Sequence, residues 1–139
     1  MMEKTLVLIK PDAFKGKHTG DIIRIYEEAG LTLLALRMMK MTKDVAAKHY
    51  VEHIGRPYYE ELETFMTSGP IIAMVLAGDN AIAKVRDING KTDPKEAAPG
   101  TIRQLYAASK GENAVHASDS PESAAREIHI FFNETEIFD

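Results

Sequence analysis

The sequence predicts an α/β fold of the sandwich type (α+β), in which helices cover one face of a single sheet. Two observations lead to this prediction. Short runs of aliphatic and β-branched residues alternate with segments whose apolar residues recur at helical spacing, and glycine or proline separates most of these segments. The chain has 139 residues, of which 45% are hydrophobic, so it can bury an ordinary core. We therefore expect residues 1–139 to form a single domain.

Four apolar runs are predicted to be strands: residues 5–9, 31–41, 71–77 and 128–132. The second run is apolar at positions that face both ways, which is typical of a central strand. In the last run His129 alternates with isoleucines, which favours a structural histidine. Periodicity does not order the strands within the sheet.

Helices are predicted where a capping residue or a proline precedes apolar residues at helical spacing. These helices begin at Thr19, Thr42, Pro57, Asn80 and Ser120. Gly30, Gly55 and Gly90 are expected to end the first, second and fourth of them. Residues 89–100 and 107–120 are rich in Gly, Pro, Ser, Asn and Asp, so we expect loops there.

Charge and composition limit the classes of partner and of chemistry. The chain has 17 Lys and Arg against 21 Asp and Glu, for a net charge of −4, so we expect neither a nucleic-acid nor a membrane partner. The run at residues 5–9 is too short to cross a bilayer and no export signal precedes it, which predicts a cytoplasmic protein. The absence of cysteine excludes disulfides, thiolate zinc sites and cysteine nucleophiles. An anionic substrate stays possible, because an acidic protein can contain a local basic pocket.

Residues 90–92 (GKT) match the end of a phosphate-binding P-loop, but we reject that interpretation. The motif needs a glycine five positions before Gly90, where this chain has Val85. The segment also follows a predicted helix, whereas a P-loop follows a strand and opens a helix.

His116 is the strongest candidate nucleophile among the five histidines. Its small neighbours leave the ring accessible, and neutral imidazole is a good nucleophile near pH 7 because its unperturbed pKa is about 6.5. His49 and His53 lie one helical turn apart and could share a metal ion. Glu52 does not directly follow His49 and no third ligand is evident, so we favour a solvated pair there.

Four cationic residues stand at the ends of predicted elements: Lys10, Arg56, Arg86 and Arg103. Phosphoryl transfer needs such cations because negative charge spreads over the phosphate oxygens in the transition state. For each of these residues taken alone, solvated surface is the stronger interpretation, because lysine and arginine are usually solvated. Tyr58 and Tyr59 could stack on a base, although aromatic residues at a helix start more often pack in the core.

Six segments closely resemble the nucleoside diphosphate kinase family, in the family's order and across residues 4–135. They are residues 7–12 (VLIKPD), 56–59 (RPYY), 68–70 (SGP), 90–94 (GKTDP), 99–103 (PGTIR) and 113–120 (NAVHASDS). The last segment, around His116, is the most specific. The resemblance implies an enzyme that moves the γ-phosphate of a nucleoside triphosphate, mainly ATP, to a nucleoside diphosphate, with Mg²⁺ and a phosphohistidine intermediate.

The resemblance also implies roles for individual residues. His116 falls on the family's nucleophile, with Tyr50 and Ser118 beside it and Glu127 on the far ring nitrogen. Asp119 falls where a carboxylate helps to hold Mg²⁺ through water. The family's nucleotide contacts fall on Lys10, Arg56, Arg86, Thr92 and Arg103 for phosphate and ribose, Asn113 for the ribose 3′-hydroxyl and Tyr58 for the base.

For the fold, the resemblance implies a ferredoxin-like βαββαβ sandwich with a four-stranded antiparallel sheet, forming one catalytic domain. For the assembly, it implies a homo-oligomer built from a common dimer, and we expect a hexamer first and a tetramer second. Tyr58 and Ala117 replace the commoner Phe and Gly, while Glu112 and residues 104–106 depart from the family pattern in a loop used at subunit contacts. The end of the sequence at Asp139 favours a bacterial type.

Two alternatives compete with the enzyme. A non-catalytic nucleotide-binding module of the same fold would need no nucleophile, so His116 together with Lys10, Tyr50 and Glu127 argues against it. A DNA-binding role has no basic stripe or recognition motif in its favour.

Overall fold

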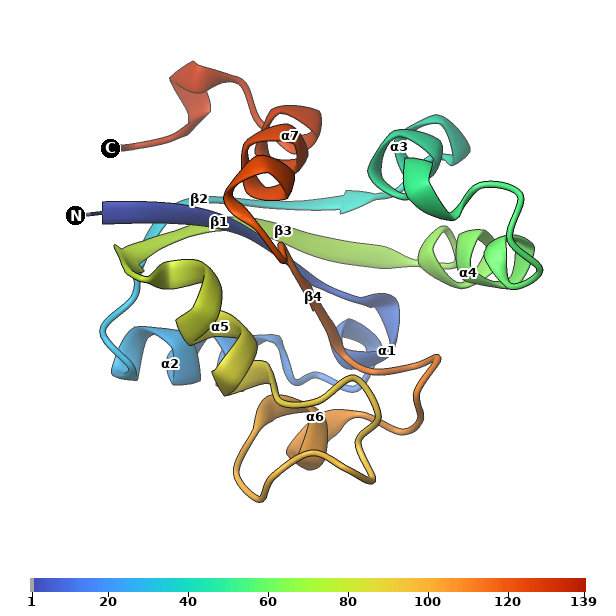
Figure 1. The fold of residues 1–139 in the computed structure, drawn as a ribbon, viewed down its shortest axis with the longest axis horizontal. Helices are drawn as coiled ribbons and strands as arrows, with labels where there is room; N and C mark the ends of the chain where they lie inside the picture. The colour runs from blue at the N-terminus through green and yellow to red at the C-terminus, as the bar shows by residue number, and fades with distance from the viewer. Residues whose placement is uncertain (1) are drawn as a thin grey trace.

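A computed structural model describes residues 2–139 and contains one four-stranded antiparallel sheet (Figure 1). The strands are β1 (Met2–Ile9), β2 (Thr32–Lys40), β3 (Pro70–Asp79) and β4 (Val115–Ala117), in the spatial order β2-β3-β1-β4. β1 lies between β3 and β4, with Ile9 opposite both Ile72 and Val115. This strand order and the interleaved helices confirm the predicted ferredoxin-like α+β sandwich.

Seven α-helices connect the strands within the described residues 2–139. They are α1 (Pro11–Lys15), α2 (Thr19–Glu28), α3 (Lys43–His49), α4 (Tyr59–Met66), α5 (Ala81–Asn89), α6 (Ile102–Tyr106) and α7 (Pro121–Phe131). Short 3₁₀ turns cover Val51–His53 and Glu134–Glu136. No helix in this part of the chain combines the length and the apolar character that a bilayer crossing requires.

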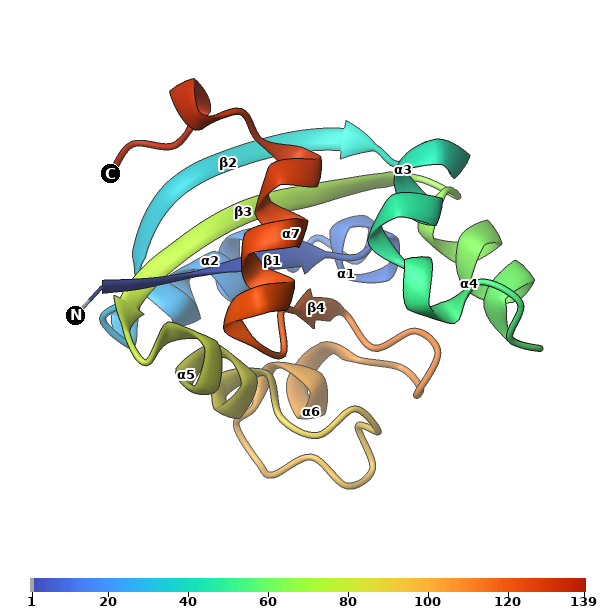
Figure 2. The ribbon, with the colours of Figure 1, turned by 45° about the horizontal axis from the view of Figure 1, so that its top comes forward.

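Helices cover both faces of the sheet, so the prediction that only one face is covered was wrong (Figures 1 and 2). Side chains alternate along a strand, and Leu8 of β1 points into a core closed by α3, α4 and α7. Its neighbours Val7 and Ile9 point into a second core closed by α1, α2, α5 and α6. Strand β3 is buried on both faces from Ile71 to Gly78, which is why its run is almost wholly apolar.

The fourth strand was predicted in the wrong place. Residues 128–132 belong to the end of α7 and to the residue after it, and the fourth strand is β4. Pro121 occupies the first turn of α7 and the Ser120 hydroxyl accepts a hydrogen bond from the backbone N–H of Ser123, so the helix has a strong start. A short run of β-branched and aromatic residues fits a helix or a strand equally well. Three-residue β4 is too short to produce a periodic signal, so the sequence placed it in a loop.

Other elements differ in smaller ways. β2 is an edge strand and not the expected central one, and Leu36 and Met38 on it are 47% and 60% exposed. Thr42 caps α3 as predicted, accepting a hydrogen bond from the backbone N–H of Val45. α2 begins at Thr19, but its N-cap residue is His18. The other corrections are that α3 ends at residue 49, α4 begins at residue 59, and the five-residue helices α1 and α6 were not predicted.

Gly90 ends α5, as the sequence predicts, with a positive φ of 86° that favours glycine. A Cβ atom there would lie 2.6 Å from the Oγ1 atom of Thr101, so a larger residue would push the start of α6 away. This close approach brings residues 90–92 and α6 to the same side of β4, where the predicted site residues gather.

Candidate active site

A cavity of about 330 Å³ is lined by residues of α3, α5, α6, β4 and α7 and by Lys10, which directly follows β1. Each of these elements contributes a predicted site residue or a neighbour of one. The polar residues that matter most are Lys10, Tyr50, Arg86, Arg103, His116 and Glu127. Residues far apart in the sequence therefore meet in one basic cavity, as expected for a phosphate-transfer site.

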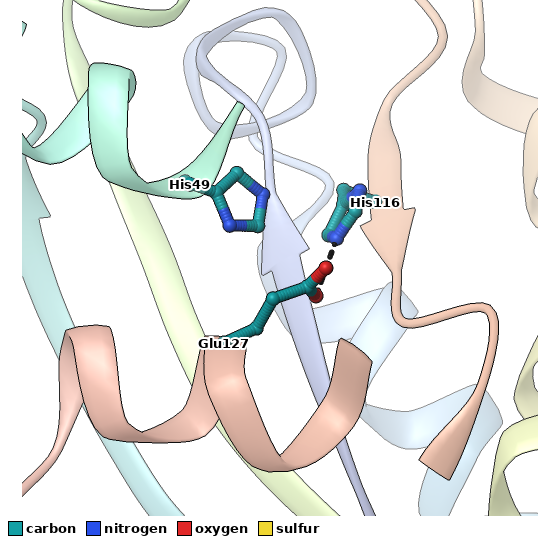
Figure 3. Close-up of side chains that lie close together, drawn as sticks. All are labelled: His49, His116 and Glu127. Carbon is teal, nitrogen blue, oxygen red and sulfur yellow. Dashed lines mark hydrogen bonds and ion pairs between the residues drawn. The ribbon is translucent and has the colours of Figure 1, made fainter. Parts of the chain in front are cut away.

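His116 occupies the middle of β4, opposite Leu8 of β1. Its Nε2 atom lies 2.9 Å from the Oε1 atom of Glu127, which comes from the buried face of α7 (Figure 3). The hydroxyl of Ser118 donates to the same carboxylate oxygen at 2.9 Å, and accepts a hydrogen bond from the backbone N–H of Leu6. Since Glu127 faces Nε2, the arrangement favours the tautomer with the proton on Nε2 and a free lone pair on Nδ1.

Electrostatics keep His116 neutral. Burial, reinforced by the positive charges of Lys10 and Arg103, lowers the pKa of His116 to about 3. Burial also raises the pKa of Glu127. A neutral imidazole has a lone pair available at physiological pH, so His116 is suited to act as a nucleophile.

The turn that leads into β4 is held in an unusual conformation. Ala114 has a φ of 73°, in the left-handed region, and is fully buried. Its backbone N–H donates to a carboxylate oxygen of Asp12 at 3.0 Å, and its carbonyl accepts from the backbone N–H of Lys10 at 2.8 Å. These bonds fix the start of β4 against the end of β1, two residues before His116. Asp12 was not predicted as a site residue; its place after Pro11 in residues 7–12 was the available signal.

Lys10 and Asn113 form a buried pair at the cavity wall. The Nζ atom of Lys10 donates to the Oδ1 atom of Asn113 at 2.8 Å, and both side chains are buried. The Nδ2 group of Asn113 donates to the backbone carbonyl of Thr92 at 3.4 Å, which ties residues 90–92 to the same wall. Burial and the nearby charge of Arg103 lower the pKa of Lys10 to about 8, against the smaller opposing effect of Asp12.

Arg103 has a structural function in addition to its charge. Its guanidinium donates to the backbone carbonyls of Gly90 at 2.8 Å, Val115 at 2.9 Å and Asn113 at 3.3 Å. A guanidinium has five N–H donors, so two are left for a ligand in the cavity that Arg103 lines. The three bonds hold the long segment between α5 and β4 around the site.

Tyr58 lies beside a second cavity of about 800 Å³, which it shares with residues 109–112. Lys10 and Thr92 line both cavities, so the two are neighbours. The hydroxyl of Tyr58 is hydrogen-bonded to the Nδ1 atom of His53 at a distance of 2.5 Å. Tyr58 is 48% exposed, which leaves its ring available to a base.

The remaining predicted residues differ in how well the structure brings them to the site. Arg86 and Asp119 are exposed residues that line the 330 Å³ cavity. Tyr50 packs its ring 6.4 Å from the ring of His116, but its buried hydroxyl has no hydrogen-bond partner among residues 2–139. Arg56 is exposed and lines neither of the two cavities.

The interpretation of His49 and His53 as a solvated pair was wrong. His49 is only 3% exposed, and its ring meets the ring of His116 edge to face at a centroid distance of 4.5 Å. His53 is partly buried and binds Tyr58. The signal for His49 was its position three residues after the buried Ala46, which places both on the inner face of α3.

Comparisons with known proteins agree with the geometry. The family model described as "Nucleoside diphosphate kinase" matches residues 3–137. A protein of that name from Persephonella marina is 52% identical over 136 residues, covering 98% of this chain and 97% of its own length. Another, from Methanocaldococcus jannaschii, is 52% identical over 139 residues, covering 100% of this chain and 99% of its own length.

Solved structures give the same picture. The nucleoside diphosphate kinase of Aquifex aeolicus has a TM-score of 0.96 and 44% identity, covering 99% of both chains. The halophilic enzyme of Halobacterium salinarum, solved in complex with CDP, has a TM-score of 0.97 and 39% identity, covering 100% of this chain and 93% of its own.

Proposed function

The chain belongs to the nucleoside diphosphate kinase family and acts on nucleoside phosphates, and we propose that it transfers the γ-phosphate through a phosphohistidine on Nδ1 of His116. One observation carries the assignment of the atom. Glu127 engages Nε2 at 2.9 Å, which favours a lone pair on Nδ1 of the neutral ring, in a cavity that Lys10 and Arg103 also line. The non-catalytic alternative has no support, because the curated relatives are named as kinases.

The reaction would proceed in two transfers at one site. In the first, the Nδ1 lone pair of His116 attacks the γ-phosphorus of a nucleoside triphosphate, mainly ATP, and the bond to the β–γ bridging oxygen breaks. The imidazole gains positive charge, which the carboxylate of Glu127 stabilises through the Nε2–H. In the second, a terminal oxygen of a nucleoside diphosphate attacks the same phosphorus and the N–P bond breaks. Neutral His116 is regenerated, which gives ping-pong kinetics.

Cationic residues around the cavity would stabilise the transferring phosphoryl group. Lys10, Arg86 and Arg103 line the cavity, and their charges offset those that develop on the phosphate oxygens. Arg56 belongs to this set only if substrate binding draws its exposed side chain inward. Ser118 acts through Glu127, and Tyr50 supports the ring of His116 by packing.

The nucleoside would lie across the two neighbouring cavities. Tyr58 would stack on the base without reading its edge, which suits an enzyme that accepts every base. Thr92, which lines both cavities, would contact the phosphates, and Asn113, which lines the cavity of His116, would contact the ribose 3′-hydroxyl.

The family implies dependence on a divalent cation, and we propose Mg²⁺. Mg²⁺ commonly takes one or two carboxylates together with substrate phosphates and water. Asp119 fits this requirement: its exposed carboxylate lines the cavity of His116 and is close enough for its charge to oppose the lowered pKa of that histidine. When bound to the nucleotide, the ion would supply charge neutralisation at the phosphates.

We also propose that the protein works as a homo-oligomer built from a common dimer, with a hexamer as first choice and a tetramer as second. Leu36 and Met38 expose apolar surface on the edge strand β2, which supports burial against another copy. The substrates of the protein suggest a cytoplasmic location. We further propose that residues 1–139 form one catalytic domain and that neither a membrane nor a nucleic acid is a partner.

A labelling experiment tests the proposed nucleophile. ATP labelled in the γ-phosphate should leave an acid-labile, base-stable label on the protein, and GDP should discharge it. His116→Ala should take up no label, while His129→Ala, which changes an exposed histidine of α7, should be labelled like the unmodified protein. Equal labelling of the His116→Ala protein would show that the mechanism is wrong.

A further inference from the structure

His49 is a buried polar side chain that the proposed reaction does not use. It is 3% exposed at the end of α3, and neither of its ring nitrogens has a hydrogen-bond partner among residues 2–139. Its surroundings are rings: those of Tyr50, His116 and Phe131 lie at centroid distances of 4.5, 4.5 and 5.4 Å. A buried donor or acceptor without a partner costs about 1–3 kcal/mol, so a group that satisfied His49 would be bound favourably.

The unpartnered nitrogens of His49 lie next to two other potential metal ligands (Figure 3). One ligand atom each from His49, His116 and Glu127 fall within 4.8 Å of one another, and the last two residues are already 2.9 Å apart. Zinc bonds to nitrogen and oxygen are about 2.0–2.2 Å long, which sets tetrahedral ligand atoms roughly 3.4 Å apart. Side-chain movements of about 1 Å would therefore close the three residues around one ion.

We propose that His49, His116 and Glu127 form an inhibitory site for one divalent transition-metal ion, best matched by Zn²⁺ and separate from the Mg²⁺ that accompanies the nucleotide. Two imidazoles and one carboxylate are a typical ligand set for zinc, whereas Mg²⁺ prefers oxygen ligands only. The open cavity leaves a fourth position for water. Ser118, which donates to Glu127 at 2.9 Å, would orient the carboxylate as an outer-shell partner.

The positive charges around the site limit its affinity for a divalent cation. Arg126 approaches the second carboxylate oxygen of Glu127 at 3.7 Å, and Lys10, Arg86 and Arg103 line the same cavity. A dication is repelled by these four cations, and the three carboxylates that line the cavity, those of Glu52, Asp119 and Glu127, offset this repulsion only in part. We expect a dissociation constant on the order of micromolar, which suits reversible inhibition and not a permanent structural metal.

Inhibition follows from the tautomer of His116, and this part of the inference rests on the proposed nucleophile. A neutral imidazole has one proton and one lone pair. When the metal takes the lone pair at Nε2, the single proton must reside on Nδ1. The nitrogen that would attack the γ-phosphorus then carries a proton and cannot react, while the total number of protons on the ring is unchanged.

Calorimetry with Zn²⁺ alone, without nucleotide, tests the site directly. We expect one binding event per chain, weakened at least tenfold by His49→Phe, which fills the same space among aromatic rings without a ligand atom. His129→Gln is the matched control, because that histidine is exposed on α7 and should not change Zn²⁺ binding. Circular dichroism checks that each variant is folded, and His49→Gln provides a second ligand deletion. Unchanged affinity in both His49 variants would overturn the site.

The labelling assay tests the consequence. Micromolar Zn²⁺ added with excess Mg²⁺ and ATP should suppress phosphorylation of the unmodified protein, and His49→Phe should need at least tenfold more Zn²⁺ for the same suppression. Chelation of Zn²⁺ by ATP is identical in the two arms, so it cannot produce the difference. Equal suppression in both proteins would overturn the inhibitory role. Absence of labelling without Zn²⁺ would instead contradict the proposed nucleophile, while the calorimetric site would stand.

Discussion

Replacing Glu127 with glutamine should slow phosphorylation of the protein without unfolding it. Glu127 is buried on α7 and is the acceptor for the Nε2–H of His116. Glutamine has nearly the same shape, so the packing survives, but it carries no charge. Its amide can also donate to Nε2, which would place the ring proton on Nδ1, the attacking atom.

The magnitude follows from the type of hydrogen bond. A hydrogen bond to a charged group contributes about 1.5–3 kcal/mol, against about 0.5–1.5 kcal/mol for a neutral one. At about 1.4 kcal/mol per factor of ten, Glu127→Gln should slow phosphorylation roughly 10- to 150-fold. Ser118→Ala removes a donor that reaches His116 only through this carboxylate, so it should slow phosphorylation less than Glu127→Gln does.

Rapid-quench measurement of the first label transfer isolates this step from product release. Glu127→Asp is the second variant: it keeps the charge but draws the carboxylate back, so its rate should lie between those of the glutamine variant and the unmodified protein. Thermal unfolding shows whether each variant keeps its fold. A Glu127→Gln protein that is phosphorylated within twofold of the normal rate would refute charge stabilisation by the carboxylate.

Three further predictions concern the groups around the site. Lys10→Met should abolish most phosphorylation yet leave thermal stability equal or higher, because burial lowers the pKa of this lysine to about 8 and its cation is costly to bury; a clear fall in melting temperature would contradict this. Tyr58→Phe removes the bond to His53 but keeps the ring, so steady-state kinetics should show a KM for nucleotide raised about two- to fivefold with kcat unchanged, and a changed kcat would argue against a positioning role. Stability should also decline in acid, because burial lowers the pKa of His49 to about 2 and that of His116 to about 3. In acid the unfolded chain binds more protons than the folded one. The stabilisation that comes from these neutral histidines is therefore present above about pH 6.5, and the free energy of unfolding falls by about 2 kcal/mol per histidine between pH 7 and 5. Urea unfolding of His49→Phe should show a correspondingly weaker pH dependence, and an unchanged one would refute the assignment.

Much of the fold was predictable because its elements carry local signals. Thr42 caps α3 and Gly90 ends α5, as their side chains or the lack of one would suggest. β4 gave no such signal, because its three residues pair with β1 through tertiary contacts that the local sequence does not encode. The apolar run at the end of α7 was mistaken for a strand, because a helix buried along one stripe and a short strand have similar composition.

The site, like the fold, has features with a local signal in the sequence and features that depend on tertiary contacts. Residue types identified His116 and its cations, and the resemblance supplied Glu127 and Ser118. Neither the residue types nor the resemblance indicated that Arg103 donates three hydrogen bonds to backbone carbonyls. Such bonds depend on where the chain folds back, which is a property of the whole loop and not of a motif.

The neutral state that would make His116 a nucleophile also allows it to bind a metal ion. The charge of the cavity determines whether phosphate or the metal ion is favoured. A neutral imidazole ring offers a lone pair to phosphorus or to Zn²⁺ alike. Lys10, which lines that cavity, attracts the phosphate and repels the dication. Removing its charge by Lys10→Met should therefore strengthen Zn²⁺ binding about tenfold and abolish phosphorylation. The repulsion between two nearby like charges in a protein is on the order of 1–4 kcal/mol, which is enough for such a change. Calorimetry of Lys10→Met beside Lys40→Met, which removes an exposed charge at the end of β2, measures the difference; equal affinities would show that the cavity's cations do not exclude metals.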